Sequence, residues 1–188
     1  MLRGDVVNFY RIQPPTISAS LVDQMEDSWF RPDDNPLGNG EFKPRDNGLA
    51  ARVLWDSDKR IHLMVEKLAR YFRREFDYDC VQYSAVESTT RNKTTEAFLW
   101  SVTGLSATGY IQVAIGACCF RWRKWKDAPP GWALQWIWLH PYERNQGRLT
   151  RAWPYFRERF GDFHVEPPLS PAMRAFVAKQ ANLPKSGD

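Results

Sequence analysis

The chain has 188 residues, of which 43% are hydrophobic and 26% charged, and its formal net charge is +4. This composition excludes a mostly disordered or fibrous protein and suits one globular domain with an ordered extension. The sequence has no run of about 18 apolar residues, and an acidic residue near its start interrupts any signal-peptide core. We therefore expect a cytoplasmic protein that does not bind a membrane.

The three cysteines, Cys80, Cys118 and Cys119, favour a reducing compartment. Their number is odd, two of them are adjacent, and no Cys-x-x-Cys pair or Cys/His cluster accompanies them. This spacing indicates neither a disulfide framework nor a zinc site, so we expect no metal.

Residues 1–50 are rich in turn-forming residues, and we expect an irregular N-terminal extension there. Within it we predict a short strand at residues 6–10 and a short helix over residues 18–29, where apolar side chains recur at helical spacing. Residues 51–182 are expected to form the folded domain, and residues 183–188 a tail.

The folded domain begins with an amphipathic helix. Asp56 or Ser57 caps it, and apolar side chains recur every three or four positions as far as Phe76. Four short segments with β character follow, which suits an antiparallel meander: residues 80–86, 96–102, 110–122 and 132–139. In the last of these, alternation predicts that Trp136 and Trp138 share one face with Trp132 and Leu134.

A second helix is predicted over residues 144–160, because apolar side chains recur on one face from Leu149 to Phe160. Gly161 would end it. A buried strand at residues 163–165 and a last helix opening at Ser170-Pro171 complete the pattern. The fold class is therefore mixed α/β, with a central mixed, mostly antiparallel sheet flanked by helices and a short C-terminus.

The most specific stretch runs from Trp132 to Thr150. It is an apolar strand that leads through His140-Pro141 into a basic turn and then a helix. Amide groups at a helix start are unpaired and point outward with the positive end of the helix dipole. Arg144 and Arg148 add charge there, and Gly147 lets the backbone approach a ligand closely. The stretch predicts a cradle for an anion such as a pyrophosphate.

At these residues the chain resembles the GNAT superfamily of acetyl-CoA-dependent N-acetyltransferases. The signature of that family is a strand ending in Val-x-Pro, then an Arg/Gln-x-x-Gly-x-Gly/Ala loop and a long helix. Leu139-His140-Pro141 matches the first part. Residues 144–149 match the second, except that Leu149 replaces the small residue. The likeness covers about residues 116–177. The layout of residues 144–176, with a Pro-x-Ser-Pro-like stretch at residues 168–176, is loosely similar to the cohesin acetyltransferases.

The resemblance implies transfer of an acetyl group from acetyl-CoA, an acyl-CoA co-substrate, to a primary amine of a small molecule or protein. The fifth strand, residues 162–166, would splay from the fourth strand to admit the pantetheine arm. The backbone at Trp138 and Leu139 would pair with that arm. The loop amides that would hold the pyrophosphate belong to Arg144, Asn145, Gln146, Gly147, Arg148 and Leu149.

Catalysis needs a base, because an amine attacks a thioester only when unprotonated, and a donor for the departing thiolate. Glu166, which would face the thioester, is the first candidate base. Glu96 on a neighbouring strand is the second, and His140 is the third. Ser170 is the candidate donor, as a hydroxyl after the fifth strand often is in this family. From the residues alone, Glu166 also reads as an ordinary strand-end charge and Ser170 as a helix cap.

Two other functions stay open. Leu149, the lack of an unambiguous base and the lack of the two final strands of the usual fold favour a catalytically inactive binding or interaction module. Residues 121–126 interleave Arg and Lys with indoles, which favours a basic nucleic-acid-binding protein. The N-terminal extension or a second subunit would have to wall the acceptor side, and an exposed strand edge there favours a homodimer.

Overall fold

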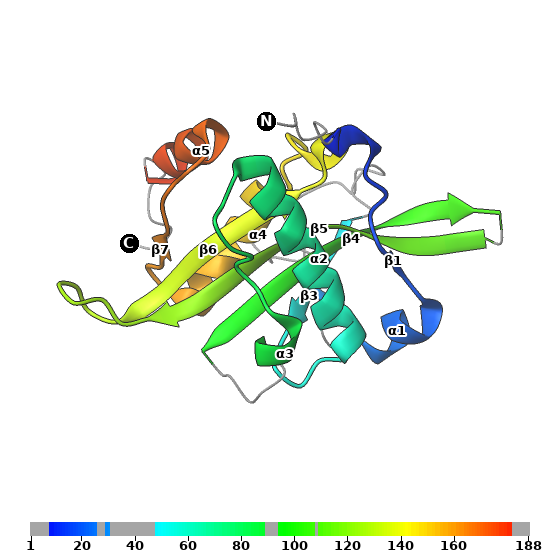
Figure 1. Ribbon diagram of the computed structural model, residues 1–188, viewed down its shortest axis with the longest axis horizontal. Coiled ribbons are helices and arrows are strands. Elements are labelled where there is room, and N and C mark those ends of the chain that lie inside the picture. The colour runs from blue at the N-terminus through cyan, green and yellow to red at the C-terminus, as the bar shows by residue number, and fades with distance from the viewer. Residues whose placement is uncertain (1–7, 26–28, 31–47, 89–93, 108, 182–188) are drawn as a thin grey trace, which may run out of the picture.

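The computed structural model describes residues 8–25, 29–30, 48–88, 94–107 and 109–181. These residues form one sheet with helices on both faces (Figure 1). Within the described ranges, no helix is long and apolar enough to cross a bilayer. The expected mixed α/β architecture is confirmed.

The sheet has seven strands in the order β2-β3-β4-β5-β6-β7, and β1 pairs with β5 outside that path. Every pairing is antiparallel except the one between β6 and β7. The strands are β1 (Thr16–Ile17), β2 (Trp29–Phe30), β3 (Gly48–Val53), β4 (Thr95–Ser106), β5 (Gly109–Arg123), β6 (Gly131–Leu139) and β7 (His164–Val165).

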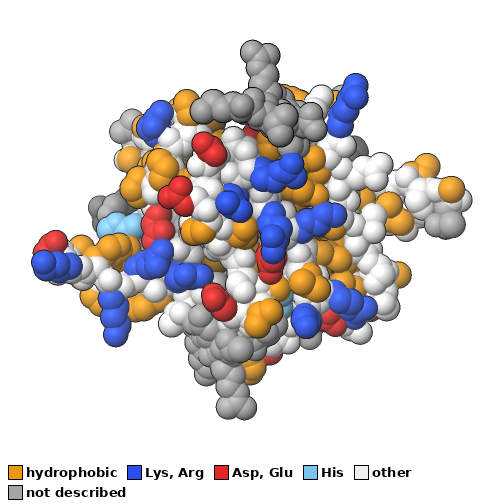
Figure 2. Space-filling view, viewed as in Figure 1, with side chains coloured by type: hydrophobic (Ala, Val, Ile, Leu, Met, Phe, Trp, Pro, Cys, Tyr) orange, Lys and Arg blue, Asp and Glu red, His pale blue; other side chains and the backbone are white. Residues whose placement is uncertain are grey.

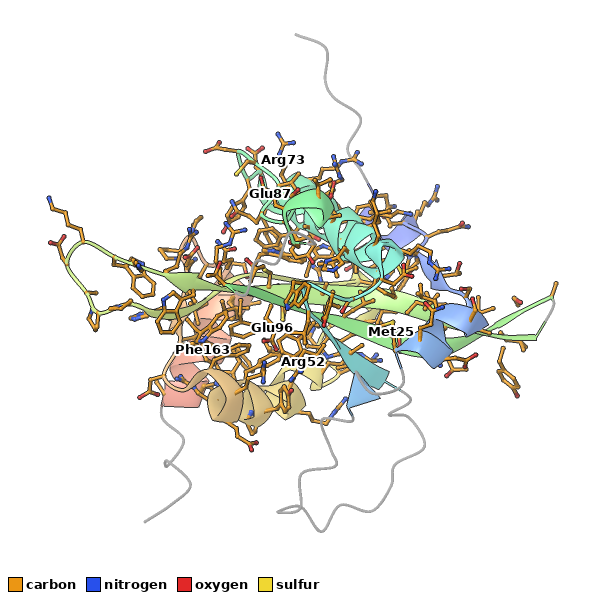
Figure 3. The ribbon with its side chains drawn as sticks, turned by 90° about the horizontal axis from the view of Figure 1, so that it is seen from below. Met25, Arg52, Arg73, Glu87, Glu96 and Phe163 are labelled. Atoms are coloured by element: carbon orange, nitrogen blue, oxygen red, sulfur yellow. The ribbon has the colours of Figure 1, made fainter. Side chains whose placement is uncertain are left out.

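The α2 helix covers one face of the sheet, and α4 and α5 lie on the other (Figure 3). The helices are α1 (Ala19–Gln24), α2 (Lys59–Phe76), α3 (Ala85–Ser88), α4 (Arg148–Phe160) and α5 (Pro171–Ala181), with short 3-10 turns η1 (Phe9–Arg11) and η3 (Pro141–Glu143). The sheet therefore separates two hydrophobic cores, one beneath α2 and one beneath α4.

The α2 helix confirms the predicted amphipathic helix, with a cap one residue later than expected. Asp58 accepts a hydrogen bond from the Arg60 backbone, and hydrogen bonding to the Arg60 side chain lowers the pKa of Asp58 to about 2. The helix ends at Asp77, whose φ of 54° is left-handed. Figure 2 shows Lys and Arg side chains gathered over this helix, and the exposed ones are Lys59, Arg60, Lys67, Arg70, Arg73 and Arg74.

Several predicted elements differ from the structure. Residues 80–86 do not form a strand: they are a loop that leads into α3, because no neighbouring strand pairs with them. The predicted helix over residues 18–29 is shorter, and its last residues lie partly outside the described chain and partly in β2. In place of the strand at 6–10 the structure has η1, with residues 6 and 7 outside the description. β3 was not predicted, and the expected boundary after residue 50 falls inside it.

The described N-terminal segment pairs with the edge of β5 from the point where β6 ends its pairing with that edge. His140, just after β6, donates its backbone N–H to the Ile115 carbonyl (2.7 Å), and the next amide on that edge, of Ala114, donates to the Pro15 carbonyl (2.8 Å). β1 then continues along β5. In the described part of the extension, β1 pairs with β5 and β2 pairs with β3. These strands lie away from the open edge of β6.

Gly116 on β5 lies where the backbone and side chain of β6 leave no room for a Cβ. A Cβ built there would lie 2.4 Å from Leu139 Cδ2 and 2.7 Å from the Trp138 carbonyl oxygen, whereas a Cβ on Gly131 would meet nothing closer than 3.7 Å. We expect Gly116→Ala to lower the free energy of unfolding by about 2 kcal/mol through overpacking. Gly131→Ala should leave it almost unchanged. Urea denaturation of both variants checks this, and equal stabilities would contradict the packing.

His62 lies on the buried face of α2 and contacts the Tyr83 hydroxyl at 2.6 Å through Nδ1. Burial lowers the pKa of His62 below its usual value of about 6.5. The unfolded chain therefore binds a proton more readily, and the free energy of unfolding should fall as the pH drops below about 6.5. Denaturation of His62→Gln between about pH 8 and 5.5 should lack this slope. His164→Gln, at an exposed histidine, should retain it, and identical slopes in both variants would refute the assignment.

Candidate functional site

The parallel pairing of β6 and β7 is very short. Ala133 pairs with His164 and Leu134 with Val165, and the Glu166 amide donates to the Leu134 carbonyl at 3.0 Å. Two prolines follow Glu166, and proline has no N–H with which to extend a ladder. Beyond Leu134, β6 has no strand neighbour on this side among the described residues. The predicted splay between these strands is present.

A β-bulge at Gln135 lies where the two strands part. Cys119 pairs with Trp136 and Phe120 with Leu134, so Gln135 is an extra residue in β6. Leu134 belongs to the core beneath α4, and Trp136 belongs to the core beneath α2. The expectation that the alternating residues from 132 to 138 share one face is therefore wrong, because an extra residue reverses the alternation.

The bulge also decides which peptide groups face the open edge of β6. His140 bonds to β5, and Trp138 is paired with Ala117, so the peptide groups of these alternate residues point toward β5. Those of Ile137 and Leu139 point away from β5, toward the splay. Arg144 Nε donates to the Leu139 carbonyl oxygen at 2.9 Å. An extended ligand with amide groups would thus pair at Ile137 and Leu139, not at the peptide group of Trp138.

The predicted anion cradle follows β6 directly. The turn η3 leads into two residues with left-handed backbone, Asn145 (φ 58°) and Gly147 (φ 74°). Gly147 is the N-cap, so α4 begins at Arg148, four residues later than predicted. Successive amides around left-handed residues, followed by a helix start, form a concave surface that favours an anion.

Both arginines of this loop are bound to carboxylates. Arg144 makes two hydrogen bonds to Glu75 (2.7 and 2.6 Å), and Glu75 also accepts from Trp138 Nε1 at 2.6 Å. Arg148 is only 7% exposed and pairs with Glu143. In this structure the positive potential of the loop therefore comes mainly from its amides and the helix dipole, because each guanidinium is neutralised.

A groove follows the open edge of β6 from the loop to the bulge. It consists of two adjoining pockets, of about 310 Å³ at the loop and about 180 Å³ at the bulge. Four residues line both: Phe76, Ile137, Ser170 and Met173. The predicted cofactor residues Trp138, Leu139, Arg144, Asn145, Gly147, Arg148 and Leu149 line the larger pocket, and Gln146 does not.

Two of the predicted catalytic residues lie on this groove. Glu166 lines the pocket at the bulge, where it accepts hydrogen bonds from Arg123 (2.7 and 3.2 Å) and from Gln135 Nε2 (3.4 Å). Ser170 lines both pockets, and its Oγ accepts from the Met173 amide at 3.2 Å. Ser170 is thus a helix cap that also lines the groove.

His140, the third candidate base, is committed to backbone bonds. It is 6% exposed, Nε2 lies 3.1 Å from the Ile12 carbonyl oxygen, and Nδ1 accepts from the Tyr142 amide at 3.4 Å. A ring that accepts at Nδ1 and bonds a carbonyl at Nε2 is a neutral imidazole with its proton on Nε2. His140 joins the N-terminal segment to η3, and both nitrogens are occupied, which argues against a role as base.

Glu96, the second candidate base, lies away from the groove. It is 5% exposed, and it pairs with Arg159 of α4 and with Arg52 (3.7 Å). Figure 3 shows Glu96 and Arg52 on the α4 side of the sheet, opposite Arg73 and Glu87. The expectation that Glu96 borders the substrate groove is wrong, because its position in β4 turns its side chain to the other face.

Replacement of Glu96 by Gln should affect stability and not ligand binding. It leaves two half-buried guanidinium groups without their carboxylate, so we expect the free energy of unfolding to fall by about 2 kcal/mol. Denaturant unfolding and acetyl-CoA titration of the same sample provide the check. Lost binding in a variant of unchanged stability would restore Glu96 as a site residue.

Residues 121–126 do not present one continuous surface. Trp122 packs against Trp132, with ring centroids 5.8 Å apart, and Trp125 packs against the His164 ring at 4.6 Å. Arg123 is bound to Glu166. Both indoles thus pack against other rings. The structure does not support the surface for base stacking that the nucleic-acid-binding hypothesis requires.

Sequence reasoning missed Tyr78, Gln135 and Glu75. Tyr78 lines the pocket at the bulge, and its hydroxyl donates to the Pro168 carbonyl at 2.7 Å. Burial raises the pKa of Tyr78, and the charge of Glu166 adds to this effect. No local sequence pattern marks these residues. Glu75 and Tyr78 approach β6 and the segment after β7 only in the folded chain, and the contact of Gln135 with Glu166 also forms only there.

No protein-family model and no curated protein sequence matches the chain. Among solved structures, the xEco2 acetyltransferase domain matches with a TM-score of 0.50 and 14% identity, covering 77% of this chain and 90% of that one. The same domain bound to a CoA conjugate gives a TM-score of 0.51 and 15% identity, covering 77% and 92%.

A third similar structure is a ribosomal-protein-alanine N-acetyltransferase from Brucella melitensis biovar Abortus 2308. It gives a TM-score of 0.45 and 11% identity, covering 75% of this chain and 94% of that one. Identities this low bear on the fold alone. The order of the strands, the splay of β6 from β7 and the likeness to the xEco2 domain agree: the chain has the GNAT N-acetyltransferase fold.

Proposed function

We propose that the protein is an N-acyltransferase that transfers the acetyl group of acetyl-CoA to a primary amine. The observation that carries this proposal is the continuous groove from the loop after η3 to the bulge at Gln135. One end offers backbone amides for an anion, the middle offers an unpaired strand edge, and the other end offers a carboxylate and a hydroxyl. A long ligand with a pyrophosphate, amide groups and a reactive end fits this order.

In the proposed complex the pyrophosphate lies on the amides of residues 145–149, at the start of α4. The pantetheine arm extends along Ile137 and Leu139 as an added strand, because peptide groups on an open sheet edge pair with amides of a ligand. The thioester then reaches the bulge, between Gln135 and Ser170. Arg144 would contribute by holding the end of β6 to α2 through Glu75.

In the proposed reaction the amine nitrogen attacks the thioester carbon, a C–N bond forms and the C–S bond breaks. Glu166 accepts the proton of the amine, directly or through water. Arg123, its bidentate partner, holds the orientation of the carboxylate. The departing thiolate receives a hydrogen bond from Ser170. The Tyr78 hydroxyl instead donates to the Pro168 carbonyl at 2.7 Å and so helps to hold the segment that leads to Ser170.

Two substitutions on α5 test the groove. Ala172 lines the larger pocket, and Ala178 is exposed on the opposite side of the same helix. We expect the wild-type protein to bind acetyl-CoA saturably in calorimetry, Ala172→Trp to weaken binding by about 10-fold or more because the indole fills the groove, and Ala178→Trp to bind normally.

Turnover separates an enzyme from a binding module. Release of CoA in the presence of mixed amines should be lost in Glu166→Gln while acetyl-CoA affinity is retained. Absence of binding by folded wild-type protein, or equal binding by both tryptophan variants, would refute the proposed groove. Binding of acetyl-CoA without turnover would support the groove as the acetyl-CoA site and contradict the proposed acetyl transfer.

A further inference from the structure

A group of polar side chains gathers at the bulge end of the groove, on the face of the sheet that α2 covers. Arg121 of β5 is paired with Thr95 of β4. Two residues further along β5, Arg123 reaches Glu166, which Gln135 also contacts. We call Thr95, Arg121, Arg123, Gln135 and Glu166 the polar subsite. It extends beyond the pocket in which the thioester would lie.

The positions of the two arginines on β5 place them beside one buried thiol. Cys119 belongs to the core beneath α2, and Arg121 and Arg123 follow it at every second position, on the same face of β5. Burial raises the pKa of Cys119 to about 12, the charges of Arg121 and Arg123 oppose this rise, and that of Glu166 adds to it.

Several polar atoms of the subsite are buried without a hydrogen-bond partner within the described part of the chain. They are Thr95 Oγ1, Arg121 Nε and Gln135 Oε1. Thr95 is 8% exposed and Gln135 only 5%. Folded proteins leave few buried polar groups unpaired, and each one needs an explanation. A ligand that bonds to all three atoms supplies one.

The two arginines of the subsite differ in their charge balance. Arg123 is neutralised by Glu166, whereas no carboxylate of the described residues forms an ion pair with Arg121. A half-buried guanidinium without an anion is unfavourable, and its planar N–H groups suit a carboxylate. Arg121 is therefore the point at which an oxyanion would bind.

Donors and acceptors occupy opposite sides of the subsite. The donors, Arg121 and the Thr95 hydroxyl, lie on β5 and β4, while Gln135 Oε1 and the Glu166 carboxylate lie beside the groove. A ligand with an amine at one end and an oxyanion at the other satisfies both sides. We propose that the acceptor is an amino carboxylate, with its amine at Glu166 and Gln135 and its carboxylate on Arg121. This inference rests on the proposed acetyl transfer.

Amines of matched length test the proposed carboxylate. With saturating acetyl-CoA, 4-aminobutyrate, n-butylamine and 1,4-diaminobutane differ only in the charge of the far end. A series from glycine to 6-aminohexanoate scans the length, and 3-aminopropylphosphonate replaces the carboxylate by another oxyanion. We expect kcat/KM of the best amino carboxylate to exceed that of the alkylamine of its length by about 10-fold or more.

Arg121→Gln is the diagnostic variant, with Lys124→Gln as its control. Lys124 is exposed on the same hairpin, so its replacement removes an equal charge outside the subsite. Arg121→Gln should lower kcat/KM for the amino carboxylate far more than for butylamine and should retain acetyl-CoA affinity. Lys124→Gln should retain the preference. Calorimetric titration with the amino carboxylates gives a second readout that needs no turnover.

Each remaining outcome is decisive. Equal use of the alkylamine or diamine, a preference for the phosphonate, or failure to bind any amino carboxylate in a protein that binds acetyl-CoA would overturn the inference. Loss of acetyl-CoA binding itself would instead overturn the proposed function. In that case titration of the amino carboxylates against wild type and Arg121→Gln still determines whether the subsite binds them.

Discussion

The separation of β6 from β7 after Leu134 is the constraint on which the rest of the site depends. A central strand of a sheet normally bonds on both edges, and here one edge of β6 is open over its second half. The bulge at Gln135 and the prolines after Glu166 produce this separation by local means, since one shifts the register and the others cannot donate. The groove, the helix cap at Ser170 and the polar subsite all lie around that opening.

Charge in the site is organised as pairs. Each of these ion pairs joins two segments that are distant in the sequence or lie across a turn: Arg144 with Glu75, Arg123 with Glu166, and Arg148 with Glu143. Such pairs hold geometry more than they attract a ligand, because each positive group already has its counter-ion. Arg121 of the polar subsite differs from these arginines, because no carboxylate in the described part of the chain forms an ion pair with it, and this difference gives it a separate role.

Local patterns were sufficient to predict much of the fold. The amphipathic period of α2, three of the four predicted strands of the meander and the strand-loop-helix stretch at residues 132–150 are local features that the structure contains, whereas residues 80–86 form a loop and the start of α3. Glu166 and Ser170, which line the groove, were predicted from the family resemblance, which places them at and after the fifth strand. Errors arose where distant segments decide the outcome: the bulge at Gln135 depends on pairing with β5, and the face of Glu96 depends on the position of β4 in the sheet. Ion pairs such as Glu75 with Arg144 join residues 69 positions apart, so no window of sequence contains them.

The N-terminal segment lies end to end with β6 along one edge of β5. The smallest unit that retains these contacts therefore reaches back at least to Ile12, because the carbonyls of Ile12 and Pro15 bond to the His140 ring and the Ala114 amide. A fragment that begins at residue 51 would lose part of β3 and would leave the edge of β5 bare beside the loop after η3. The segment that looks dispensable in sequence is thus part of the scaffold of the ligand-binding loop, and its removal would loosen that loop from a distance.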